Sequence, residues 1–269
     1  MTSRYAVLGN PVAHSLSPDI HAFFAKGLSD DIEYGRILVP EGRFEVTARE
    51  FFRTGSGCNI TVPCKGEAFK LADSLSDFAR TAQAVNTLKL MDDGSLYGDN
   101  TDGRGLAADL KAKGIAIRGA SLLILGAGGA ARGILKPLID EDPASIVVAN
   151  RTYEKARALE DLLGGPVRAM ELSKVKGGFG IVINATSASL AGAVPAVDRE
   201  VLAQSACACD LMYRPGGHTV FTDFAAQCGC KRAFDGLGML VMQAALSYQL
   251  WRGVMPDYEG AFRHFSSNA

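Results

Sequence analysis

An apolar run that stops at a glycine-rich turn is the feature that most constrains this fold. Residues 121–125 read SLLIL, and GAGGAAR follows at 126–132. Gly126 permits a tight turn, Gly128 lets the backbone approach a pyrophosphate, and the helix that follows directs its N-terminal amides at the phosphate charge. Ala131 takes the third position of this fingerprint. The pattern predicts a buried parallel strand that ends in a dinucleotide loop; a simple strand-to-helix turn is the alternative.

The next predicted strand suggests which dinucleotide the loop binds. Residues 146–149 read IVVA, and Asn150, Arg151 and Thr152 follow without an Asp or Glu. An acid at this strand end hydrogen-bonds the ribose 2′-hydroxyl of NAD, whereas an arginine pairs with the 2′-phosphate of NADP. Arg151, with Lys155 one turn later, therefore favours NADP. Alternatively, Arg151 and Lys155 are solvent-exposed basic residues at the start of a helix and bind no phosphate.

Strand and helix patterns alternate through the rest of the second half. Further strands are expected at 181–184 and 207–211, with a short one at 231–234, and the intervals between strands are long enough for helices. Such crossovers predict an α/β fold with a parallel, doubly wound sheet. Pro137 falls inside the helix that follows the glycine loop, where a proline costs about 3 kcal/mol or forces a kink. We keep the helix.

The first half follows the same alternation. Strands are expected at 5–8, 32–39 and 58–62, helices around 20–28 and 44–52, and a hairpin of 86–90 with 95–97 across Asp93 and Gly94. A last helix, 237–251, presents Leu240, Val241, Ala244, Tyr248 and Trp251 on one face. With 269 residues the chain favours two domains over one.

Composition and charge exclude several partners. The formal net charge is −1 with mixed signs throughout, which offers no basic stripe to nucleic acid and no cluster to a membrane surface. No apolar run approaches the roughly 20 residues that a spanning helix needs, and no signal peptide is evident. We expect a cytoplasmic protein with a small metabolite as substrate; a homodimer is kept as a candidate assembly.

The six cysteines indicate neither a metal site nor disulfides. They stand at 58, 64, 207, 209, 228 and 230, in no spacing typical of zinc, so no metal is predicted and reduced, buried thiols are favoured. Cys64 adjoins Lys65, whose ammonium could lower the pKa of the thiol.

Four polar residues ahead of the glycine loop are candidates for a substrate site. Ser15 and Ser17 precede a helix, with Pro18 at its expected first position, and two hydroxyls at a helix N-terminus suit a carboxylate. Lys65 ends NITVPCK, and Asp102 lies in GDNTDG. Each has a plainer alternative: Ser17 as an N-cap, Lys65 as a surface charge, and Asp102 as an N-cap for a helix from Gly103.

Together these motifs resemble the shikimate dehydrogenase family over nearly the whole chain. The motifs, in the order and spacing of that family, are GNPVAHSLSP (9–18), NITVPCK (59–65), AVNT (84–87), GDNTDG (98–103), GAGGAAR (126–132), NRT (150–152), NATS (184–187) and DGLGML (235–240). The resemblance implies NADP-dependent reduction of 3-dehydroshikimate to shikimate, a step of aromatic amino acid (chorismate) biosynthesis. It also implies an N-terminal α/β substrate domain, 1–102 and 237–269, and a Rossmann NADP domain, 103–236.

The resemblance also assigns roles. Lys65 and Asp102 would be the catalytic pair; the substrate would bind to Ser15, Ser17, Thr61, Asn86, Asp102, Gln243 and Tyr213. The cofactor would bind to Gly126, Ala127, Gly128, Gly129, Ala130, Asn150, Arg151, Thr152, Lys155, Gly236 and Met239.

Some positions depart from the usual pattern of the family. Ala188, Ser189 and Leu190 follow NATS where a glycine is common, Arg214 stands where small or neutral residues are more common, and HTVF at 218–221 lacks a frequent proline. The first of these puts contacts of that loop with the cofactor in doubt.

Two other functions remain open from the sequence. A quinate/shikimate dehydrogenase shares the fold, accepts an extra hydroxyl and often uses NAD; Arg151 without a nearby acid disfavours it. A non-catalytic NADP-binding sensor could use the same scaffold, and the loss of Lys65 or Asp102 would favour it, but both are present.

Overall fold

The computed structural model describes residues 2–214 and 216–267, except for the side chain of Leu190. The chain forms two compact units: unit 1 takes in Met1–Gly105 and Leu240–Arg263, and unit 2 takes in Leu106–Met239 and His264–Ala269. Among the described residues, no helix is long and apolar enough to cross a membrane.

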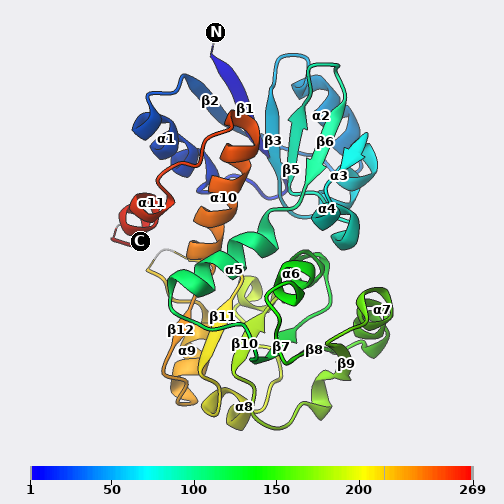
Figure 1. The fold of residues 1–269 in the computed structure, drawn as a ribbon, viewed down its shortest axis with the longest axis vertical. Coiled ribbons are helices and arrows are strands. Elements are labelled where there is room, and N and C mark those ends of the chain that lie inside the picture. The colour runs from blue at the N-terminus through cyan, green and yellow to red at the C-terminus, as the bar shows by residue number, and fades with distance from the viewer. Residues whose placement is uncertain (1, 215, 268–269) are drawn as a thin grey trace. The chain divides into compact units, whose positions relative to one another are not determined.

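Unit 2 contains the predicted parallel, doubly wound sheet (Figure 1). Its strands run in the order β12-β11-β10-β7-β8-β9, the arrangement of a Rossmann fold, and every neighbouring pair is parallel. The strand bounds are β7 Ser121–Leu125, β8 Ser145–Asn150, β9 Val167–Glu171, β10 Ile181–Asn184, β11 Cys207–Asp210 and β12 Ala233–Phe234. Sequence reasoning missed β9, because its VRAME lacks an apolar run.

Alternating side chains of this sheet enter two separate cores. Leu122 and Ile124 of β7 pack with α5, α6 and α7 on one face, whereas Leu123 and Leu125 pack with α8 and α9 on the other. The bounds are α5 Asp102–Ala112, α6 Gly129–Ile139, α7 Tyr153–Leu163, α8 Arg199–Ala203 and α9 Val220–Gln227. Short 3₁₀ turns, η1 Leu172–Lys174 and η2 Ala188–Ala191, follow β9 and β10.

The helix expected despite Pro137 is present as α6. The helix ends at Ile139, and Pro137 is a buried residue of its last turn. A proline in the last turn removes one backbone donor but leaves the start of the helix, where phosphate binding is expected, unchanged.

Unit 1 contains a mixed sheet in the order β2-β1-β3-β5-β6-β4. The predicted hairpin is the antiparallel pair β5 and β6, and β5 is also antiparallel to β3. The strand bounds are β1 Ser3–Gly9, β2 Ile32–Leu38, β3 Gly57–Ile60, β4 Ser74–Leu75, β5 Thr87–Leu90 and β6 Leu96–Asp99.

Helices cover both faces of this sheet. One core joins Ala6, Leu8, Cys58 and Ile60 to residues of α2, α3 and α4. On the opposite face, Tyr5 of β1 stacks on Trp251 of α10, so the apolar face predicted for the last helix packs against this sheet. The helix bounds are α1 Ser17–Leu28, α2 Phe44–Phe51, α3 Lys65–Leu71, α4 Asp77–Ala82, α10 Leu237–Arg252 and α11 Tyr258–Ser267.

A buried histidine lies among the aromatic rings between α1, β2 and α10. The ring of His21 is stacked on Tyr34 with centroids 4.3 Å apart, and the rings of Tyr248 and Trp251 lie within 6.0 Å. Among the described residues, no well-formed hydrogen bond satisfies either ring nitrogen, although the Asn59 side chain lies nearby. Burial lowers the pKa of His21 from 6.5 to about 3, and the nearby Asn59 side chain opposes this shift only in part.

His21 is therefore neutral in the folded protein, and this makes stability depend on pH. In the unfolded chain this histidine binds a proton below about pH 6.5. In the folded protein it binds one only below about pH 3. The free energy of unfolding should then fall by about 1 kcal/mol per pH unit on this account alone between pH 6 and pH 4. His21→Phe keeps the stacked ring and should remove this part of the slope, measured by urea unfolding at several pH values. Equal slopes in parent and variant would contradict the assignment.

Candidate active site and dinucleotide loop

An ion pair between Lys65 and Asp102 is the centre of the substrate-side site. Lys65 is the first residue of α3 and Asp102 the first of α5. The Lys65 Nζ lies 2.5 Å from Asp102 Oδ2, and the two side chains are 21% and 9% exposed. The structure thus brings the two predicted catalytic residues together, and Lys65 is not an isolated surface charge.

Asn86 holds the other oxygen of the same carboxylate. Its Nδ2 donates to Asp102 Oδ1 at 2.8 Å and lies 3.2 Å from Gln243 Oε1 on α10. Asn86 and Gln243 are both buried. Four of the predicted residues, from distant parts of the chain, therefore form one connected group.

The turn from β6 into α5 fixes the position of Asp102. The Asp102 backbone N–H donates to Asn100 Oδ1 at 3.1 Å, and the Thr101 N–H donates to Asn86 Oδ1 at 2.9 Å. The alternative that Asp102 caps a helix from Gly103 is wrong, because α5 begins at Asp102 and both carboxylate oxygens bind side chains.

Ser15 and Ser17 also lie together, although Ser17 is not the predicted N-cap. The helix α1 begins at Ser17, its N-cap is Leu16, and Pro18 consequently occupies the second helical position rather than the first. The Ser15 hydroxyl donates to the Ser17 hydroxyl at 3.2 Å and accepts from the Ser17 N–H at 3.2 Å. Because Ser17 is itself the first residue of the helix, it does not cap it.

A buried polar network, which sequence reasoning missed, connects this site. The Tyr34 hydroxyl donates to Asn59 Oδ1 at 2.7 Å, and Asn59 Nδ2 donates to Ser247 Oγ at 2.9 Å. Ser247 Oγ lies 2.8 Å from Thr87 Oγ1, which in turn donates to Asn86 Oδ1. Asn59 stood in the quoted NITVPCK, but its partner is 188 residues away along the chain, so periodicity could not find it.

Thr61 and Tyr213 have less direct support. Thr61 follows β3, and a Cβ on Gly9 would lie 2.2 Å from Thr61 Cγ2, so glycine is required for this close approach. Tyr213 lies in unit 2, in the segment after β11. Their roles stay predictions.

The suggestion that Lys65 lowers the pKa of Cys64 is wrong. Burial raises the pKa of the Cys64 thiol, and the nearby Glu67 carboxylate adds to the increase. Cys64 is 2% exposed. The thiol is thus an inert part of the core of unit 1.

In unit 2, the glycine loop has the backbone expected for phosphate binding. Gly126 has φ +103°, and a Cβ there would lie 2.9 Å from Thr186 Cγ2. Gly128 is the N-cap of α6 and Gly129 its first residue, and a Cβ added at either would meet open space. Backbone N–H groups at this helix start are therefore open to an anion.

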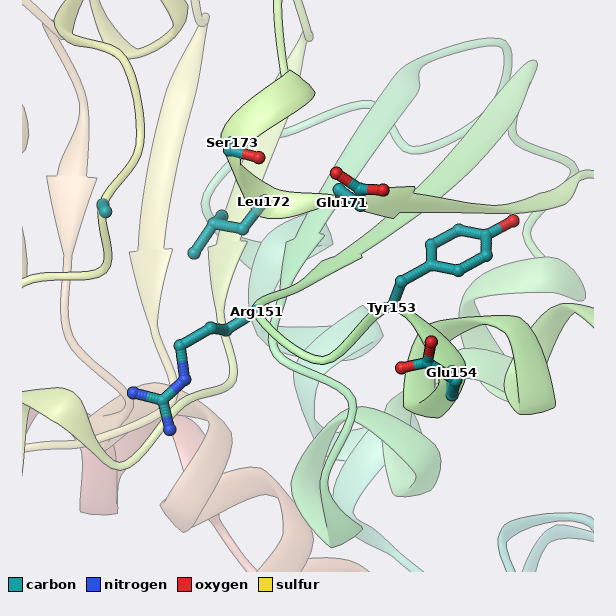
Figure 2. Close-up of a pocket in the computed structure, with 7 residues that line it drawn as sticks. Arg151, Tyr153, Glu154, Glu171, Leu172 and Ser173 are labelled. Carbon is teal, nitrogen blue, oxygen red and sulfur yellow. The ribbon is translucent and has the colours of Figure 1, made fainter.

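Arg151 lines a hollow of about 390 Å³ at the ends of β8 and β9. Figure 2 shows Arg151 leaving the turn after β8, with Tyr153 and Glu154 at the start of α7 and Glu171 and Leu172 beside them. Across residues 2–214 and 216–267, no carboxylate lies within ion-pair distance of Arg151, so its charge is available to a phosphate.

The remaining residues of this predicted group surround the same turn. Asn150 Nδ2 donates to the Thr152 carbonyl at 2.8 Å, Thr152 is the N-cap of α7, and Lys155 is exposed on its first turn. Glu154 and Glu171 also line this hollow. They were not expected from the sequence, because neither lies directly after β8. Glu171 forms an ion pair with Lys174 at 2.9 Å.

Two of the departures from the family pattern lie in one cluster. Ser189 Oγ donates to Asp210 Oδ2 at 2.6 Å, and Arg214 Nη2 donates to the Ser189 carbonyl at 3.2 Å. The Leu190 side chain lies outside the described part. Ser189 therefore supplies a hydrogen bond that holds η2 to the end of β11.

Gly236 and Met239 lie where β12 leads into α10. A Cβ on Gly236 would lie 2.4 Å from the Leu211 carbonyl oxygen, so the backbone here allows no side chain. Met239 is half-buried against the core that includes α5 and α6. The described residues contain no group of three or more His, Cys, Asp or Glu side chains that could hold a metal ion.

Three family models match the chain. They are the shikimate dehydrogenase substrate binding domain over residues 7–88, shikimate/quinate 5-dehydrogenase over 108–205, and the shikimate 5′-dehydrogenase C-terminal domain over 236–260. The chain is also 48% identical to the shikimate dehydrogenase (NADP(+)) of Vibrio cholerae serotype O1, across 98% of this chain and 96% of that protein. The chain belongs to the shikimate dehydrogenase family.

Solved structures agree with this membership. An Ael1 enzyme from Pseudomonas putida is 41% identical with a TM-score of 0.92, covering 98% of each chain. The shikimate 5-dehydrogenase of Thermus thermophilus, solved in complex with NADP(H) and shikimate, is 36% identical with a TM-score of 0.89 and covers 100% of each chain. The family resemblance predicted from the motifs is confirmed.

Two glycines of the loop should respond differently to the same substitution. Gly126→Ala places a side chain at positive φ against Thr186, so its melting temperature should fall by several degrees, reflecting about 1–3 kcal/mol. Gly128→Ala, with φ −86°, should keep the melting temperature of the parent and weaken dinucleotide binding. Calorimetry and dinucleotide titration check both. Unchanged binding by Gly128→Ala would contradict the phosphate role of the loop.

Proposed function

We propose that this protein catalyses the reversible NADPH-dependent reduction of 3-dehydroshikimate to shikimate, a step toward chorismate and the aromatic amino acids. The Lys65–Asp102 pair, joined to Asn86 and Gln243, is the observation that carries this proposal. It supplies a proton donor beside groups able to hold ring hydroxyls. The oxidoreductase relatives described above support the same reaction.

Lys65 stabilises the charge that develops on the reacting oxygen. When bound, NADPH supplies the hydride, which adds to the carbonyl carbon. The carbonyl oxygen gains negative charge, and the Lys65 ammonium donates the proton that completes the alcohol. Asp102 fixes the Lys65 Nζ through Oδ2, while Asn86 prevents its carboxylate from turning away.

The substrate is held by groups of two kinds. Ser15 and Ser17 present hydroxyls at the start of α1, where an anion is favoured, and we assign them the ring carboxylate, with Thr61 close by. Asn86, Asp102 and Gln243 bind the ring hydroxyls. Tyr213 is proposed as a further substrate contact.

The cofactor residues fit NADP. The loop from Gly126 to Ala130 offers open N–H groups at the start of α6 to the pyrophosphate. Arg151, with Asn150, Thr152 and Lys155, binds the 2′-phosphate, because a guanidinium that pairs with no carboxylate of the described residues suits that dianion. Gly236 and Met239 are assigned to the nicotinamide end. A cytoplasmic location remains a prediction, as does a homodimer.

One assay tests the function. The purified protein is offered shikimate or quinate with NADP⁺ or NAD⁺ in all four combinations, and reduced cofactor is followed by absorbance. Turnover confined to shikimate with NADP⁺ is expected, since Arg151 favours the 2′-phosphate. Comparable turnover of quinate or NAD⁺ would place the protein among quinate/shikimate dehydrogenases, and no turnover in any combination would favour the sensor.

The catalytic role of Lys65 gives a separate prediction. Lys65→Ala should lower kcat by about 10²–10⁴-fold with little change in the KM for shikimate, because the proton donor acts mainly in the transition state. Lys70→Ala is the matched control, since Lys70 is exposed on the same helix α3. Steady-state kinetics at saturating NADP⁺ measure both. A Lys65→Ala enzyme with near-normal kcat would refute the role.

A further inference from the structure

Arg36 reaches from β2 to the loop that carries the serine pair. Its Nε and Nη2 both donate to the backbone carbonyl of Ser15, at 3.1 and 2.7 Å. Nη2 also lies 3.1 Å from Asp19 Oδ2 in the first turn of α1. One guanidinium thus fixes both the backbone of Ser15 and an acidic side chain two residues after Ser17.

The charges around the serine pair make this contact important for an anion. Ser15 and Ser17 are neutral, and the Asp19 carboxylate repels a second carboxylate seated beside them. The amides at the start of α1 attract it, but their effect is limited to the first turn. The Arg36 charge cancels that of Asp19, with side chains 37% and 59% exposed.

The neighbouring tyrosine does not replace this cation. Tyr34 lies on the same strand, and burial raises the pKa of its hydroxyl well above 10, an effect that Ser17 and Arg36 oppose only in part. It is therefore a neutral hydroxyl, and it donates to Asn59 Oδ1.

We propose that Arg36 is a positioning residue that sets the affinity for the carboxylate of the substrate. It holds the Ser15 carbonyl so that the hydroxyls of Ser15 and Ser17 face one another, and it neutralises Asp19. This inference rests on the proposed function, because the carboxylate in question is that of shikimate.

The test is Arg36→Gln, which removes the charge and the double contact with the Ser15 carbonyl. The KM for shikimate should rise about three- to tenfold, the range for one charge-assisted hydrogen bond weakened by solvent exposure. The kcat and the KM for NADP⁺ should stay within about twofold of the parent, since neither the proton donor nor the glycine loop is touched. Arg4→Gln is the matched control: Arg4 is an exposed residue on the neighbouring β1, paired with Glu33.

Two further measurements separate positioning from a general loss of structure. Adding Asp19→Asn to Arg36→Gln should restore part of the lost affinity, because the uncompensated acid is then gone. The methyl ester of shikimate should lose clearly less affinity in Arg36→Gln than shikimate does, since it keeps hydrogen bonds to the serine hydroxyls but lacks the anion that Asp19 repels.

The outcomes distinguish this inference from the function it rests on. A parent enzyme that fails to oxidise shikimate refutes the proposed function. A parent that is active, together with an Arg36→Gln enzyme whose KM for shikimate is unchanged, overturns the inference alone. An equal rise in KM for shikimate and its methyl ester, or a double variant without recovery, also overturns it.

Discussion

The ion pair between Lys65 and Asp102 is the interaction on which the polar centre of unit 1 depends. A carboxylate that is 9% exposed is costly unless charged and hydrogen-bonded groups surround it, and Lys65 and Asn86 meet that need. Each partner is the first residue of its helix, so the ion pair joins the start of α3 to the start of α5. Gln243 of α10 lies beside Asn86.

The two groups of candidate residues depend on opposite properties. The substrate side relies on polar side chains that bind one another, through Asn59, Thr87 and Ser247, in a network with few degrees of freedom. The dinucleotide loop relies on the absence of side chains, because Gly128 and Gly129 leave open space at the start of α6. A substitution in the polar network therefore acts through lost hydrogen bonds, whereas a substitution in the glycine loop acts through added atoms.

The sequence predicts local features well and distant contacts poorly. The run SLLIL followed by GAGG predicted β7, its turn and α6 correctly, because apolar periodicity and glycine conformations are local properties. The path from Tyr34 through Asn59 to Ser247 was missed, since it joins residues far apart in the chain. Burial overturned the expectation for Cys64, and the start of α1 at Ser17 overturned the capping role of that residue.

The most direct test of this account asks whether Lys65 and Asp102 act as one unit. The kcat of Lys65→Ala, Asp102→Asn and the double variant should be compared with that of the parent. We predict that the double variant loses about as much as the more damaged single variant, because either change disables the same pair. Losses that multiply would show two independent contributions and contradict the account.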